Sequence, residues 1–128
     1  MKTVLIVDDE FDIVDVLGDL LSSEGYEVIT AANGRDGLAR LRERPVNLVL
    51  LDCMMPIVDG PEMLRLMRED ERLSHLPVVM MSAAEMRQQV RELGCSAFLK
   101  KPFDLNTLID TVARSVDDER NRKNPTSP

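Results

Sequence analysis

Apolar runs of about five residues alternate along this chain with amphipathic stretches of about ten to fifteen residues. The runs are nearly continuous in Val, Ile, Leu and Met, which is typical of strands that helices cover on both faces. Such alternation predicts repeated strand–helix–strand units and an α/β fold built on a parallel sheet. The four most apolar runs are Thr3–Val7, Leu48–Leu51, Val78–Met81 and Ala97–Leu99.

Five helices are expected from the helical spacing of apolar residues. They run from about Phe11 to Glu24, from about Gly34 to Glu43, through Met63–Met67, through Met86–Leu93, and from Asp104 to about Val116. In the first of them, a stripe that includes Phe11, Leu17 and Leu21 is expected to face the core. The remaining strand, Tyr26–Thr30, is less apolar than the others and is expected at an edge of the sheet.

Together these elements predict a doubly wound sheet with right-handed crossovers. In the flavodoxin-like strand order 2-1-3-4-5, the first and third strands are neighbours at the point where the order reverses. At 128 residues, the chain has room for one ordinary domain. We expect that domain to span residues 1–118, and we expect residues 119–128 to form a flexible tail or the stub of a linker.

Charge and composition exclude several classes of protein. The net charge of −7 disfavours direct binding of nucleic acid, which depends largely on clustered Lys and Arg. No apolar stretch approaches the roughly 20 residues needed to cross a bilayer, and the first residues do not resemble a signal peptide. Cys53 and Cys95 lack the spacing of a zinc site and are expected to be reduced thiols. We therefore expect a cytoplasmic protein that binds neither nucleic acid nor membrane.

Polar side chains suited to phosphoryl chemistry follow each of the four apolar runs. These are Asp8-Asp9, Asp52, Ser82 and Lys100-Lys101. Because the carboxyl ends of parallel strands share one edge of a sheet, where open α/β sheets bind their ligands, we expect these side chains to converge. Three crowded carboxylates repel one another unless a cation offsets them, and Mg²⁺ prefers oxygen ligands. The sequence therefore predicts a site for a divalent cation and a phosphoryl group.

Over roughly residues 3–116, the chain resembles the receiver domain of bacterial two-component response regulators. Four segments carry the resemblance, in order and each at a strand end: Asp8-Asp9, Leu51–Gly60, Ser82-Ala83 and Lys101-Pro102-Phe103. The resemblance implies a phosphorylation-dependent signalling switch of a phosphorelay. A sensor histidine kinase or a phosphotransfer protein would then donate a phosphoryl group to Asp52, which a carboxylate can accept by nucleophilic attack.

The resemblance also implies roles for the residues around Asp52. Asp9 and Asp52 would bind Mg²⁺ directly, Asp8 would act partly through water, and the backbone carbonyl of Met54 would complete the set of protein ligands. Glu10 is given no role beyond a favourable charge at the start of the first helix. The receiver would catalyse its own phosphorylation and dephosphorylation slowly, and would not be an enzyme in the ordinary sense.

Three further residues complete the expected mechanism. Lys101, the lysine of the Lys-Pro signature, and Ser82 would stabilise charge on the phosphoryl oxygens. Ser82 and Phe98 would then act as the switch, with core packing as the rival interpretation of Phe98. The output would pass through the surface of the fourth helix, fifth strand and fifth helix to a downstream protein or to a second copy in a dimer.

Two other functions are compatible with parts of the pattern. A haloacid-dehalogenase-like phosphatase or phosphotransferase also uses an aspartate nucleophile and Mg²⁺, but Met54 stands where such enzymes have a second acid. The chain is also too short for the cap domain that covers their substrates. A flavodoxin-like electron carrier is disfavoured because Asp-Asp-Glu follows the first strand, where a phosphate cradle requires hydrogen-bond donors without negative charge.

Overall fold

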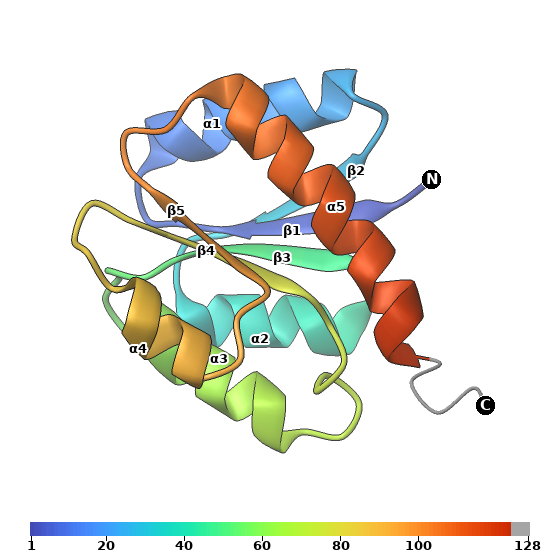
Figure 1. Ribbon diagram of the computed structural model, residues 1–128, viewed down its shortest axis with the longest axis vertical. Coiled ribbons are helices and arrows are strands. Elements are labelled where there is room, and N and C mark those ends of the chain that lie inside the picture. The colour runs from blue at the N-terminus through green and yellow to red at the C-terminus, as the bar shows by residue number, and fades with distance from the viewer. Residues whose placement is uncertain (124–128) are drawn as a thin grey trace.

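Strands and helices alternate along the whole of the described chain, which is residues 1–123 of a computed structural model (Figure 1). They are β1 (Thr3–Val7), α1 (Phe11–Ser23), β2 (Glu27–Ala31), α2 (Gly34–Glu43), β3 (Leu48–Asp52), α3 (Gly60–Glu69), β4 (Val78–Ser82), α4 (Arg87–Glu92), β5 (Ala97–Lys100) and α5 (Leu105–Lys123). The strands form one parallel sheet in the order β2-β1-β3-β4-β5. The predicted α/β fold, strand order and edge position of β2 are confirmed.

Helices cover both faces of this sheet, α1 and α5 on one and α2, α3 and α4 on the other (Figure 1). Successive residues of β1 point to opposite faces. Leu5 and Val7 lie in the cluster with α2, α3 and α4, while Val4 and Ile6 lie in the cluster with α1 and α5. All four side chains are fully buried, and this explains why the run is apolar without interruption.

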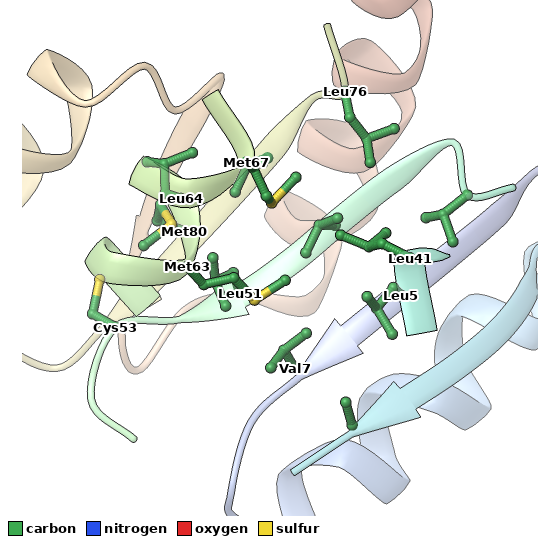
Figure 2. Packing of buried hydrophobic residues seen from close by; sticks show 14 of the residues in the cluster. Leu5, Val7, Leu41, Leu51, Cys53, Met63, Leu64, Met67, Leu76 and Met80 are labelled. Carbon is green, nitrogen blue, oxygen red and sulfur yellow. The ribbon is translucent and has the colours of Figure 1, made fainter. Parts of the chain in front are cut away.

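The larger of the two clusters fixes α3 against the sheet. Figure 2 shows Met63, Leu64 and Met67 of α3 close to Leu51 of β3 and Met80 of β4. All five are fully buried. Because residues 63, 64 and 67 share one face of a helix, this packing sets the rotation of α3 about its axis and anchors the loop that leads into it.

The start of α1 and the end of α5 differ from expectation. Phe11, expected in the buried stripe of α1, is 78% exposed, so that prediction is wrong. The first turn of α1 lies beyond the carboxyl end of β1, whereas Leu17 and Leu21 reach back over the strands. At the other end, α5 continues to Lys123, past the expected domain limit at residue 118. The rest of the expected tail, 124–128, lies outside the described residues.

A membrane-spanning helix would have to be long and apolar throughout. No helix within residues 1–123 meets that condition.

Candidate functional site

The carboxyl ends of β1, β3, β4 and β5 meet at one edge of the sheet. Asp8 directly follows β1, and β1 pairs with β3 so that Val7 lies beside Leu51, the residue before Asp52. On the other side of β3, Asp52 pairs with Met81. The structure therefore brings Asp8 and Asp52 side by side, at the point where the strand order reverses.

Lys101 joins these two carboxylates. Its Nζ lies 3.2 Å from Oδ1 of Asp52 and 3.2 Å from Oδ2 of Asp8. The side chains of Asp52 and Asp8 are only 5% and 0% exposed, so these ion pairs act largely out of water. The backbone N–H of Lys101 donates to the carbonyl of Ser82, which anchors the lysine to the end of β4, whereas Lys100 is exposed.

Glu10 supplies a third carboxylate that contacts Lys101, and sequence reasoning missed this role. Its Oε1 lies 3.2 Å from Lys101 Nζ, and its backbone N–H donates to Oδ1 of Asp8. Glu10 is the N-cap residue of α1, but its side chain makes no capping hydrogen bond. One carboxylate oxygen from each of Asp8, Glu10 and Asp52 lies within 4.8 Å of the others. The only signal for this role was the third consecutive acid at a predicted sheet edge.

Asp9 lies away from this ion-pair cluster. It is exposed and lines a separate cavity of about 310 Å³ with Cys53, Met54 and Asp59, among others. Met54 itself is largely exposed. Asp9 thus faces the loop after β3, while Asp8 and Glu10 contact Lys101. The charge of Asp9 still acts on Asp52, because it contributes to a raised pKa there.

The electrostatic balance at Asp52 is unfavourable to its charge. Burial and the neighbouring carboxylate of Asp8 raise the pKa of Asp52 to about 6, although Lys101 opposes this shift. Burial lowers the pKa of Lys101, but Asp52 and Asp8 outweigh it, and the net shift is upward. A hard divalent cation would offset the crowded carboxylates, and their oxygens are the donors that Mg²⁺ prefers. This acidic cluster fits such an ion.

The loop that follows Asp52 is held tightly. A Cβ on Gly60 would collide with the carbonyl oxygen of Asp52, so only glycine allows this close approach. The side chain of Asp59 caps α3 by accepting a hydrogen bond from the backbone N–H of Glu62. The loop also carries strain, because Ile57 and Val58 have φ angles of 51° and 64°, which β-branched residues rarely adopt. The end of the loop, residues 57–60, is therefore restricted in its path.

Ser82 and Phe98 lie on the neighbouring strands. The Ser82 side chain is fully buried, and its Oγ accepts a hydrogen bond from the backbone N–H of Ala84 at 3.0 Å. Met86 Sδ lies 3.8 Å from the same oxygen. Phe98, on β5, pairs with Met80 of β4 and is half-buried. The hydroxyl of Ser82 is thus engaged within its own loop.

Residues 4–113 match the family model described as the response regulator receiver domain. The chain belongs to this family. A relative with 32% identity over 120 residues is the polar-differentiation response regulator DivK of Brucella anthropi, and the match covers 91% of this chain and 98% of DivK. Receivers are phosphorylation switches that act in signalling, so this chain is a signalling protein and not a classical enzyme. The phosphatase and electron-carrier alternatives are overturned.

Solved receiver structures superpose closely on the chain. The chemotaxis protein CheY4 of Vibrio cholerae has a TM-score of 0.84 and 32% identity, covering 90% of this chain and 98% of that one. The response regulator TrrA of Thermotoga maritima, solved in complex with Mg²⁺ and BeF, has a TM-score of 0.81 and 30% identity, covering 89% and 98%. The receiver fold therefore accounts for about nine-tenths of this chain and for nearly all of each of the two solved chains.

Proposed function

We propose that Asp52 is the phosphoacceptor of this receiver and takes a phosphoryl group from the phosphohistidine of a sensor histidine kinase or a phosphotransfer protein. An oxygen–phosphorus bond to Asp52 forms as the phosphorus–nitrogen bond of the donor breaks, and water later hydrolyses the aspartyl phosphate. The observation that carries this proposal is the buried contact of Asp52 with the Lys101 ammonium at the carboxyl edge of the sheet. We infer that this receiver acts in the cytoplasm, where the kinase domain of its donor lies and where thiols such as Cys53 and Cys95 stay reduced.

The residues around Asp52 have complementary tasks. A phosphoryl group in transfer spreads negative charge over its oxygens, and Lys101 Nζ, already 3.2 Å from the carboxylate, is within reach of that charge. The O–H of Ser82 supplies a further hydrogen bond when it turns from Met86 Sδ to a phosphoryl oxygen. We infer that Mg²⁺ is held between Asp52 of the acidic cluster and the cavity that Asp9 and Met54 line, with Asp9, Asp52 and the Met54 carbonyl as ligands and Asp8 acting through water. When bound, the ion supplies positive charge to the carboxylates and to the phosphoryl oxygens.

The donor needs a docking surface beside the site. A cavity of about 520 Å³ lies between α1 and the connection from β5 to α5, and Lys101 is part of its wall. Its other lining residues include Ile13, Val16, Leu17 and Phe103, and are predominantly apolar. We infer that a helix of the donor, carrying the phosphohistidine, packs its apolar face here, because a helix seated beside Lys101 brings its histidine close to Asp52.

Val16→Glu tests this docking surface. Val16 is 54% exposed, so the substitution should leave the fold intact while placing a charge in the apolar groove. We expect transfer from a phosphorylated histidine-kinase or phosphotransfer domain active on the wild-type chain to slow about tenfold or more. Phosphorylation by acetyl phosphate, which needs no docking surface, should be unchanged. Ser23→Glu, exposed at the far end of α1, is the matched control. Equal rates for both variants with the protein donor would contradict the docking proposal.

The output is proposed to pass through α4, β5 and α5. Phosphorylation would shift the population of conformations on this surface, and a downstream protein or a second copy of the chain would read the change. Exposed Arg91 of α4 and Arg114 of α5 provide positive charge there in a chain with a net charge of −7.

Incubation with acetyl phosphate and Mg²⁺, followed by intact mass measurement, tests the proposed function. The wild-type chain should gain about 80 Da, the mass of one added phosphoryl group. Asp52→Ala should gain nothing. No adduct in the wild type, or an adduct that persists in Asp52→Ala, would contradict the proposal.

A further inference from the structure

Arg87, the first residue of α4, covers the ring of Phe98. Its guanidinium carbon lies 5.1 Å from the ring centroid, within the range of a cation–π contact. The two residues come from different elements, α4 and β5, and both belong to the surface proposed for output. Arg87 is exposed and Phe98 is half-buried, so the contact lies at the boundary between core and solvent.

Glu85 holds the arginine in this position. Arg87 Nη1 lies 3.2 Å and 3.5 Å from the two carboxylate oxygens of Glu85, and the backbone N–H of Arg87 donates to the same carboxylate. Two kinds of donor on one residue thus meet one acceptor, which restricts where the guanidinium can go. The loop between β4 and α4 thus restricts the position of the group that covers the ring of Phe98.

That loop begins at Ser82. The hydroxyl of Ser82 accepts from the backbone N–H of Ala84 and donates to Sδ of Met86, the residue before Arg87. If the O–H of Ser82 donates to a phosphoryl group on Asp52, it no longer donates to Met86 Sδ, and this loosens the segment that carries Glu85 and Arg87. Met86 and Arg87 thus link the Ser82 hydroxyl to the ring of Phe98, the residue expected to act in the switch.

We propose that Arg87 is a positioning residue that retains Phe98 in its unphosphorylated position and so opposes activation. The proposal rests on the proposed function and on the expectation that Phe98 is a switch residue, because it requires that the ring turns inward when Asp52 is phosphorylated. A ring that turns inward leaves the face of Arg87, and the contact is lost in the active state only. An interaction present in one state alone shifts the equilibrium by its full free energy.

Arg87→Gln tests the proposal through the binding of beryllofluoride with Mg²⁺, in which BeF₃⁻ on Asp52 stands in for the phosphoryl group. We expect the variant to bind beryllofluoride about two- to five-fold more tightly than the wild type, the range that an exposed cation–π contact supports. Without beryllofluoride, the aromatic resonances of Phe98 in the variant should shift toward the positions they take in the beryllofluoride-bound wild type. A purely structural role for Arg87 would not move them in that direction.

Arg91→Gln is the matched control, because Arg91 is an exposed arginine one turn further along α4 and its loss removes the same charge. Its affinity for beryllofluoride should equal that of the wild type. In a Phe98→Leu background, which keeps apolar bulk but removes the ring face, Arg87→Gln should have no effect.

The outcomes separate the two proposals. If Arg87→Gln binds no more tightly than Arg91→Gln, or if its effect persists in Phe98→Leu, the role of Arg87 is overturned while the role of Asp52 stands. If the wild type itself binds no beryllofluoride, or if Asp52→Asn binds it equally well, both proposals fall.

Discussion

Asp52→Asn is expected to abolish phosphoryl uptake and, without a divalent cation, to stabilise the fold at pH 7 by about 1–3 kcal/mol. The first effect follows because an amide cannot form the acyl phosphate. The second follows from the pKa of Asp52, which is raised from 3.8 to about 6 by burial and by Asp8. A substitution that abolishes function and makes the protein more stable indicates that the carboxylate of Asp52 serves the function while it lowers the stability of the fold.

The sign of the pH dependence follows from the same shift. Because the folded protein holds the Asp52 proton more tightly than the unfolded chain, this group stabilises the fold below about pH 4 and that contribution is lost as the pH rises through about 6. The gain in stability from Asp52→Asn should therefore grow between pH 4 and pH 7. Added Mg²⁺ should stabilise the wild type and reduce the difference.

Urea unfolding at pH 4, 5.5 and 7 without divalent cation measures this gain. Asp12→Asn, which removes an exposed carboxylate from the first turn of α1, is the control and should show little change at any pH. If Asp52→Asn were less stable than the wild type at pH 7, the electrostatic account of the site would be wrong.

Lys101→Met is expected to slow phosphorylation by acetyl phosphate on the order of 100-fold or more, the loss typical when one positioned electrostatic group is removed from a transition state. Lys101 is the cation that contacts Asp8, Glu10 and Asp52 together. Methionine keeps an unbranched apolar side chain but not the charge. The rate should fall at saturating Mg²⁺, which shows that the loss lies in the transfer step and not in metal binding.

Removing Lys101 also leaves two buried carboxylates uncompensated, so the variant should be less stable than the wild type in the absence of a cation. Mg²⁺ should restore part of this stability, and the rate should be measured only where circular dichroism shows a folded protein. Lys100→Met, at the adjacent exposed position, is the control. A Lys101→Met rate close to that of Lys100→Met would exclude the proposed role.

The fold was predictable because burial on both faces of a strand leaves a clear mark in the sequence. β1 and β3 are apolar at every position but their ends, and only a central position in a covered parallel sheet requires that. The meeting of Asp8 and Asp52 follows from the same topology, because parallel strands place the residues after them at one edge. No side-chain detail was needed for either conclusion.

Side-chain direction was not predictable in the same way. Glu10 and Phe11 are adjacent in sequence, yet Glu10 turns to Lys101 and Phe11 turns to solvent. Both lie where α1 begins beyond the edge of the sheet, so the helical period carries little information about their surroundings. The contact between Arg87 and Phe98 depends on how α4 lies across β5, which no local pattern encodes.

The position of the phosphoryl group on the chain decides whether Asp52 is the acceptor. Borohydride reduces an aspartyl phosphate to homoserine, and peptide mapping then identifies the reduced residue. After treatment with acetyl phosphate and Mg²⁺, homoserine should appear at position 52, only when Mg²⁺ is present, and not in Asp52→Asn. Homoserine at Asp8 or Asp9, or none at position 52 in a protein that has gained the phosphoryl mass, would contradict the account.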